Sequence, residues 1–133
     1  MAVSESATVA SYTAGSTFST GDLYKGLVLN SSGHVVVPNT TGNVLGVGTL
    51  YGRTSTTSAA GDQSVPVGTD GDIKLQMAAS TLSAGNFVGL STAGLGIAPT
   101  TDAYTFGVIK YGSSGAAGRV HTVTRIHGPL GTP

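Results

Sequence analysis

The apolar residues of the 133-residue chain occur in short segments, none of which keeps a helical period. No stretch of ten or more residues carries the 3.6-residue spacing of an amphipathic helix. Segments of about four to eight residues rich in Val, Thr, Tyr and Ile instead alternate with Gly, Asn, Asp and Ser, which is typical of short strands joined by turns. The segments expected to form strands are Tyr24–Asn30, Val35–Pro38, Val44–Tyr51, Gln63–Val67, Gly71–Met77, Asn86–Leu90, Phe106–Tyr111 and Arg119–Arg125.

About seven or eight strands in a chain of this length predict an all-β fold, as a sandwich or a small barrel. Turns are expected at Asn30–Gly33 and Gly112–Gly115, and a hairpin turn at Thr69–Asp72, because Asp-Gly favours hairpins. Only Ala78–Leu82 has any helical tendency, over one turn at most. The strand residues expected in the core are Leu27, Leu29, Val35, Val37, Val47, Val67, Ile73, Leu75, Val88, Leu90, Val108, Val120 and Val123.

The earlier and later parts of the chain share a series of short motifs, which we interpret as an internal repeat. Each copy predicts a hairpin: a Gly-Asp or Gly-Asn turn, a strand, a Gly turn, a return strand and a Pro-marked bend, since Pro cannot donate to a strand ladder. Two such units packed face to face predict a closed barrel with pseudo-twofold symmetry. The aligned segments are Gly21–Leu27 with Gly85–Leu90, Gly33–Pro38 with Gly94–Pro99, and Leu45–Val47 with Phe106–Val108, with a weaker echo at Gly61–Val67.

Residues 1–20 differ from the rest because they hold one acidic residue, no basic residue, and mostly Ser, Thr and Ala. Such a segment buries too little apolar area to offset its own ordering entropy. It is therefore either a frayed terminus or an extended N-terminal arm that orders against a neighbouring subunit through Tyr12 and Phe18. The chain is expected to divide into this arm, 1–20, and one β-barrel domain, 21–133. The first residues lack the basic and apolar regions of a secretory signal.

The composition argues against several classes of protein. With no Cys, the chain can form neither a disulfide framework nor a Cys-ligated metal site. Charged residues make up 9% of the chain and the formal net charge is zero, so the basic excess that nucleic-acid binding needs is missing. No run approaches the roughly 20 apolar residues of a membrane span. Low net charge favours self-association, so we expect a chain that works within an assembly.

The sequence predicts no catalytic, cofactor or metal site, and the chain is not expected to be an enzyme. Asp70 and Asp72 could approach a Ca²⁺ ion, but an EF-type loop needs further oxygens and a closing Glu. Turn formation explains these aspartates more simply. The glycines of 46–52 are wrongly spaced for a dinucleotide loop and precede no helix, and no Gly-x-Ser-x-Gly motif links a strand to a helix.

Histidine, arginine and tyrosine side chains are the candidates for contacts with other molecules. In a strand, positions 121, 123, 125 and 127 share one face, so two histidines and an arginine could bind an anion, titrate near neutral pH or form an interface. Tyr104 and three other tyrosines could anchor an interface, where Tyr is enriched, or lie half-buried on strands. The residues expected to make contacts with another subunit or a partner protein are Tyr12, Phe18, Tyr24, Tyr51, Tyr111, His121, Arg125 and His127.

The order of these motifs over residues 20–127 resembles small capsid decoration (cement) proteins of tailed bacteriophages. In that family "G-D-x-(V/L)" turns precede "(L/I)-G-V" strands, followed by "G-D-x-V-x-V" and a second "G-D-x-V". The corresponding segments here include Gly21–Leu23, Leu45–Val47, Gly61–Val67 and Phe106–Val108. The chain departs from the pattern with Asn86 in place of the second Asp, and with a longer Ser/Thr-rich N-terminal segment.

The resemblance implies a β-barrel or β-tulip protein that forms a homotrimer at local threefold positions between major-capsid hexamers and pentamers. Its partners would be the major capsid protein and itself, without nucleic acid or membrane. It would be made in the host cytoplasm and lie on the outer capsid surface of the virion. A protein that binds only the assembled shell stabilises it by mass action, and trimer symmetry multiplies weak contacts.

Other classes remain open from sequence. A receptor- or glycan-binding β module of a phage tail fibre would share the Gly/Thr-rich strands, although such modules usually expose aromatic platforms and this chain has no Trp. A bacterial surface or pilus subunit would be expected to carry a signal peptide. A hydrolase has the least support.

Overall fold

A computed structural model of the chain describes residues 7–39, 46–52, 63–78, 82–99, 105–111 and 118–126. These residues form two five-stranded antiparallel sheets and one short 3-10 turn, η1, so the predicted all-β class is confirmed. The first sheet holds β1 (Thr8–Thr13), β2 (Gly26–Leu29), β3 (Val35–Val36), β4 (Gly48–Leu50) and β5 (Ser64–Asp70), and η1 is Thr20–Asp22. The second sheet holds β6 (Asp72–Gln76), β7 (Phe87–Leu90), β8 (Gly96–Ile97), β9 (Thr105–Ile109) and β10 (Val120–Arg125).

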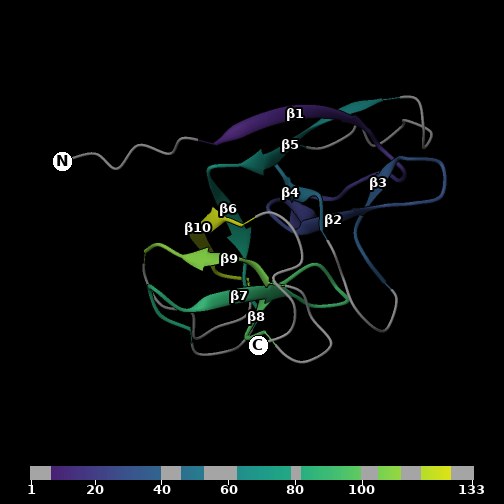
Figure 1. The fold of residues 1–133 in the computed structure, drawn as a ribbon. Coiled ribbons are helices and arrows are strands. Elements are labelled where there is room, and N and C mark those ends of the chain that lie inside the picture. Colours follow the sequence, from purple (N-terminus) through teal and green to yellow (C-terminus); the bar gives the residue numbers. More distant parts are fainter. Residues whose placement is uncertain are drawn as a thin grey trace.

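The two sheets have the same strand order. The first sheet has the order β1-β5-β4-β2-β3, and the second has the order β6-β10-β9-β7-β8. When the strands of each sheet are numbered from one to five along the chain, both sheets have the order 1-5-4-2-3. We call residues 7–70 the first half and residues 72–126 the second half. In Figure 1 the first half lies above the second, and the chain passes between the sheets from β5 to β6.

Each sheet also curls back so that its first strand reaches its third strand at the opposite edge. Just after β1, Ala14 forms a parallel bridge with Val35, and the Gly15 N–H donates to the Val35 carbonyl over 2.8 Å. Just after β6, Met77 forms the same bridge with Gly96, and the next N–H donates to the Gly96 carbonyl over 3.0 Å. Each half can therefore surround a core of its own.

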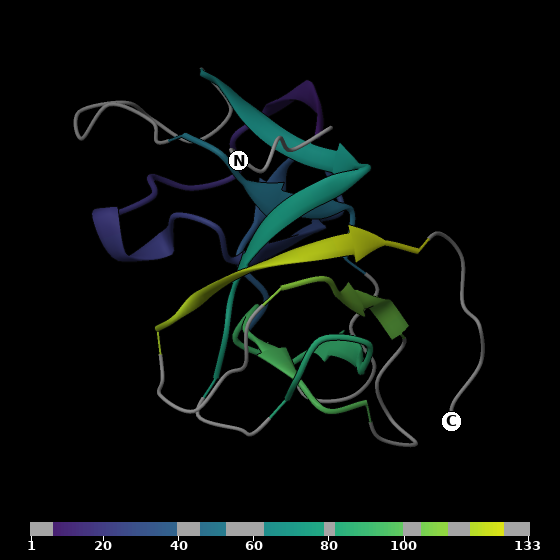
Figure 2. The same cartoon turned by 90° about the vertical axis from the view of Figure 1, so that its left-hand side faces the viewer.

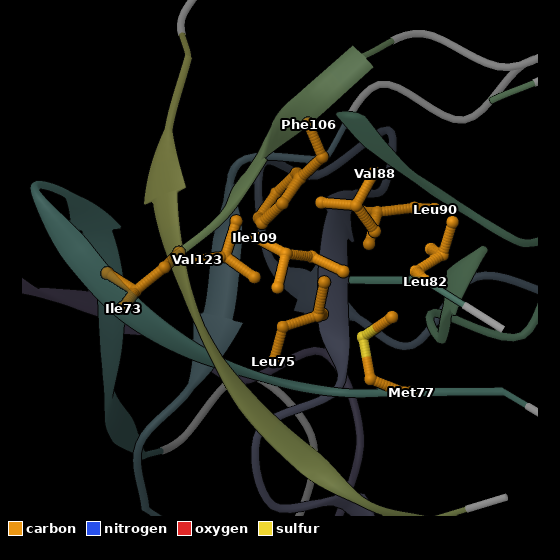
Figure 3. Close-up of a cluster of buried hydrophobic side chains, with 9 residues drawn as sticks. All are labelled: Ile73, Leu75, Met77, Leu82, Val88, Leu90, Phe106, Ile109 and Val123. Carbon is orange, nitrogen blue, oxygen red and sulfur yellow. The ribbon is translucent and has the colours of Figure 1, made fainter. Parts of the chain in front are cut away.

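The buried side chains form two separate clusters, one in each half. Alternate residues of a strand point to one face, which is why Ile73, Leu75 and Met77 point inward together. The nine side chains of the second cluster converge from β6, β7, β9, β10 and the adjoining segments (Figure 3). The first cluster comprises Ala14, Phe18, Leu27, Val35, Leu50, Val65 and Val67.

Equivalent turns join β2 to β3 and β7 to β8. The Gly33 N–H donates to the Asn30 carbonyl and the Gly94 N–H to the Ser91 carbonyl, each over 3.0 Å. The side-chain oxygens of Asn30 and Ser91 accept from the N–H groups two and four residues further on. Gly33 and Gly94 have φ of +78° and +79°, which favours glycine. The turn predicted from Asn30 to Gly33 is confirmed.

The segments before β2 and β7 also match. The Ser19 N–H donates to the Asp22 carboxylate over 2.9 Å, and the Ser83 N–H donates to Asn86 Oδ1 over 2.8 Å. Asn86 therefore keeps the acceptor that an Asp would supply. Partial burial acts to raise the pKa of Asp22, but hydrogen bonds from Ser19 and Lys25 outweigh it and the pKa is lowered.

The hairpin predicted at Thr69–Asp72 is wrong. β5 ends at Asp70 and β6 begins at Asp72, but the two strands lie in different sheets and do not pair with each other. Gly71, with φ of +74°, bends the chain from one sheet to the other, as the teal ribbon shows in Figure 2. The Asp-Gly pair therefore connects strands of two different sheets, and does not form a hairpin within one sheet.

The described part of the predicted N-terminal arm belongs to the first half. β1 pairs with β5 over its whole length, and Phe18 is 1% exposed within the first cluster. Residues 7–20 therefore form neither a frayed terminus nor a separate arm, because they are part of the sheet and core of the first half. Composition did not predict this strand, because its position depends on backbone pairing with β5 more than on large apolar side chains.

The number of strands exceeds the seven or eight expected, because β1 and β8 add to the eight predicted segments. β8 lies in the segment that the repeat marked as a return strand. Tyr104 lies outside the described residues, and three of the predicted strands, turns and helical segments fall partly or wholly outside them. These are the Gly112–Gly115 turn, residues 79–81 of Ala78–Leu82, and the first two residues of Val44–Tyr51.

Most residues predicted for the core are buried. Leu29 and Val120 are exposed, so their prediction is wrong: each lies at the end of its strand, where the cover of neighbouring elements stops. Val37, Val47 and Val108 are half-buried. The confirmed core residues are Leu27, Val35, Val67, Ile73, Leu75, Val88, Leu90 and Val123.

Candidate interaction surface

Two of the predicted contact tyrosines lie at the junction between the halves. The rings of Tyr24 and Tyr51 meet edge to face with centroids 5.3 Å apart. Tyr51 Oη accepts the Lys74 N–H over 2.7 Å, and the Tyr24 carbonyl accepts the Gln76 N–H over 2.8 Å. Both donors belong to β6, so these tyrosines bind the second half of their own chain along the outer edge of β6.

A local insertion positions Tyr24. Ser19 to Asn30 covers twelve residues, whereas the equivalent Ser83 to Ser91 covers nine. Tyr24 has a φ of +66°, a conformation that is rare for a bulky side chain. Its N–H donates to the Leu50 carbonyl over 2.7 Å, which fixes the inserted residues against β4. The extra residues therefore carry the contact with β6.

Arg125 also links the two halves. Its guanidinium donates to the carbonyls of Phe106 and Ile126 over 3.0 and 2.6 Å, and to the Gly46 carbonyl of the first half over 2.7 Å. The guanidinium carbon lies 4.1 Å from the centroid of the Phe106 ring. Burial lowers the pKa of Arg125. Its contacts are those of an internal link, in contrast to the predicted surface contact.

The row of residues predicted to share a face of the last strand points inward. Val123 is fully buried in the second cluster, and it lies between His121 and Arg125 on the same face of β10. His121 Nδ1 lies 3.2 Å from the Tyr111 carbonyl oxygen. His127 lies outside the described residues. The described part of this strand therefore does not form an exposed row of residues for binding an anion or an interface.

Of the predicted contact residues that the structure describes, only Tyr111 is exposed, at 41%. Lys110 Nζ lies 5.5 Å from the centroid of its ring. Tyr12 is half-buried and packs against the first cluster, and Phe18 is part of that cluster. Tyr111 is thus the predicted residue best placed to contact another molecule.

The sequence interpretation missed other exposed apolar side chains. Phe87 is 53% exposed on β7, directly opposite Val108 of β9. Strand alternation was the available signal, because burial of Val88 requires Phe87 to point the other way. The remaining exposed large apolar residues are Val9, Leu29 and Val120.

The acidic residues considered for a metal ion are engaged within the chain. Asp72 is paired with Lys110 and accepts from Thr124 Oγ1 over 2.9 Å. The hydrogen bond from Lys110 lowers the pKa of Asp72 against the opposing effect of burial, and Asp72 raises the pKa of Lys110. Asp70 Oδ1 accepts the Gly71 N–H over 2.7 Å. Among the described residues, no three potential ligands lie together as a metal site.

These observations define the class of the protein as all-β, with two five-stranded antiparallel sheets that share one strand order. No family model, curated protein or solved structure matches the chain. None of the helical segments in the described ranges could cross a membrane.

Proposed function

We propose that the protein is a capsid decoration protein, which binds the outer surface of an assembled phage capsid as a homotrimer between capsomers and stabilises the shell. In this proposal the two curled sheets form the β-barrel or β-tulip body of each subunit. The protein acts without catalysis: because it binds the assembled shell and not its separated subunits, its binding free energy adds to the stability of the shell.

The observation that carries the proposal is the placement of the motifs behind the resemblance. The aligned segments 33–38 and 94–99 lie in equivalent hairpins of sheets with one strand order. Asp22 and Asn86, which hold the same position in the two copies of the turn motif, accept equivalent hydrogen bonds. These two pairs of motifs thus stand at corresponding positions in the two halves, which supports the repeat on which the resemblance rests.

The chemistry of the described surface also fits a structural role. The charged groups of Asp22, Asp72 and Arg125 bond to other groups of the same chain. A contact with a shell would therefore depend on shape, apolar side chains and backbone hydrogen bonds. Tyr111 is our candidate for such a contact, since it is the exposed member of the predicted set.

The copy number of the chain in purified virus particles tests the proposal, measured by quantitative mass spectrometry against the major capsid protein. Decoration of the whole shell predicts about one chain per major capsid subunit, because symmetric sites are filled together. A few copies per particle would instead support the tail-fibre module. Absence from particles would contradict both virion functions.

A binding assay with preassembled empty shells sharpens the test. Tyr111→Ala should weaken binding about tenfold if the ring is an interface anchor. Leu29→Ala is the matched control, because it truncates another exposed apolar side chain, in the first half. Equal binding of both variants and the wild type would remove Tyr111 from the contact surface.

A further inference from the structure

The segment that passes from the first sheet to the second contains the only Asp-Gly pair of the sequence, Asp70–Gly71. Asp70 is the exposed last residue of β5, and Gly71 lies between it and β6. An aspartate carboxyl can react with the backbone nitrogen of the next residue, and a glycine there has no side chain to hinder the approach. The passage between the sheets thus combines the residue types that this backbone reaction needs.

The structure holds the two reacting groups against each other. The Gly71 N–H donates to Asp70 Oδ1 over 2.7 Å, and the carbon to be attacked, Cγ, is one bond from this oxygen. On one side, the backbone of Asp70 pairs with Thr8 of β1. On the other side, the Gly71 carbonyl accepts the Arg125 N–H over 2.8 Å. Reacting groups held in contact react faster than groups that meet by chance, so the folded chain favours attack at this site.

We propose that Asp70 is a site of isoaspartate formation, which begins when the Gly71 nitrogen attacks Asp70 Cγ. The new bond between these atoms closes a succinimide ring, and one carboxyl oxygen leaves as water with the Gly71 N–H proton and a second proton from solvent. Water then opens the ring. Addition at Cγ breaks the new bond and restores aspartate. Addition at the backbone carbonyl carbon breaks the original peptide bond instead and leaves isoaspartate, in which the chain runs through Cγ.

Isoaspartate at this position adds one carbon to the main chain between β5 and β6, and turns the former backbone carbonyl into a free carboxylate. The groups that follow are bonded to β9 and β10. The Gly71 carbonyl accepts from the Arg125 N–H, and Asp72 accepts from Thr124 Oγ1 over 2.9 Å and pairs with Lys110. The extra carbon therefore displaces Gly71 from its partner and loosens the connection between the two halves.

Asp72, two residues further on, provides an internal control. Its carboxylate is buried and is held by Lys110 and Thr124, away from the next backbone nitrogen. The next residue is Ile73, whose β-branched side chain crowds that nitrogen. The same part of the chain thus holds one aspartate that is placed to form the ring and one that is not.

Long incubation of the folded wild type in heavy-oxygen water, at physiological temperature and neutral pH, tests the proposal. Peptide mapping by mass spectrometry should find a growing isoaspartyl form at Asp70 that carries one heavy oxygen, because each ring opening takes its oxygen from water. Asp72 should stay unmodified. Asp70→Glu keeps the charge but lengthens the side chain beyond the succinimide ring, and should give no product. Wild type without isoaspartate at Asp70, or with equal amounts at Asp72, would overturn the proposal.

Two further measurements separate the effect of the fold from the chemistry of the bare sequence. The folded chain should convert Asp70 at least as fast as the same chain unfolded in urea, because the fold keeps the groups in contact. Conversion about tenfold slower in the folded chain would show that the contact protects the site, and would overturn the proposal. In the purified isoaspartyl form, the Arg125 amide should exchange hydrogen faster than in the unmodified chain. Unchanged exchange would contradict the loosened connection. None of these results depends on capsid binding.

Discussion

The two halves of the protein share a strand order, but their equivalent turns lie in different environments. The Ser91–Gly94 turn of the second half packs on the first half, where the Gly26 N–H donates to the Gly94 carbonyl over 2.7 Å. The equivalent Asn30–Gly33 turn is exposed, and a Cβ added at Gly33 would meet nothing within 4 Å. One local conformation thus serves as an internal contact in one half and as surface in the other.

Truncating the leucine before each turn should give the largest difference in stability between the two halves. Leu90 is 1% exposed and packs against Gly26, whereas Leu29 at the equivalent place is 47% exposed. Leu90→Ala should lower the free energy of unfolding by about 3 kcal/mol, because it leaves a cavity. Leu29→Ala should cost about 0.5 kcal/mol or less. Chemical denaturation measures both, and equal losses would mean that the two turns are equally buried.

The glycines of the two turns give the next largest contrast. Gly33→Ala should cost about 1 kcal/mol, since an L residue must adopt positive φ. Gly94→Ala carries the same cost, and its Cβ would also lie 2.6 Å from the Gly26 carbonyl oxygen. We expect a total loss of about 2–3 kcal/mol for Gly94→Ala. A loss no larger than that of Gly33→Ala in the same denaturation experiment would rule out close packing of this turn.

Removing one hydroxyl tests the junction that bonds the outer edge of β6. Tyr51→Phe deletes the acceptor of the Lys74 N–H, and should destabilise the protein by about 1 kcal/mol. Tyr24→Phe makes the same change on the neighbouring ring while leaving that hydrogen bond in place. In hydrogen exchange, the Lys74 amide should lose protection in the first variant alone. Unchanged protection in Tyr51→Phe would show that the hydroxyl does not protect this edge.

The smallest contrast concerns two carboxylates and pH. Lys110 lowers the pKa of Asp72 in the folded protein. The stabilising effect of the Asp72 carboxylate is therefore full above the pKa of an unfolded Asp, about 3.9, and is lost as pH falls through the folded pKa. The difference in melting temperature between wild type and Asp72→Asn should therefore shrink on acidification below about pH 4. Asp22→Asn should have less effect, because Asn86 already makes the equivalent bond in the second half. A constant difference across this range would contradict the role assigned to Asp72.

The sequence predicted the strand class and most core positions because alternation and turn residues are local signals. It failed at β1, whose Ser, Thr and Ala residues resemble a disordered terminus until β5 lies beside them. It also failed at Thr69–Asp72, because the same Asp-Gly turn chemistry serves a hairpin or a passage between sheets. Such choices depend on contacts between distant segments, which no local pattern contains.

The predicted contact residues show the same limit. Residue type identified Tyr24, Tyr51 and Arg125 as side chains that bind other structures. Each does so in the structure, Tyr24 through its ring, which lies 5.6 Å from Lys74 Nζ, but the bound structure is the other half of the chain. A repeat within one chain creates an internal interface, and sequence does not distinguish it from an interface between chains.

The inserted residues around Tyr24 have a consequence for how far the second half depends on the first. They occur in one half only, and with Tyr51 they bond the outer edge of β6 through the N–H groups of Gln76 and Lys74. A second half without the first would leave these N–H groups unpaired on an edge strand, and such an edge can pair with other chains. The insertion thus makes the first half a cover for an edge of the second.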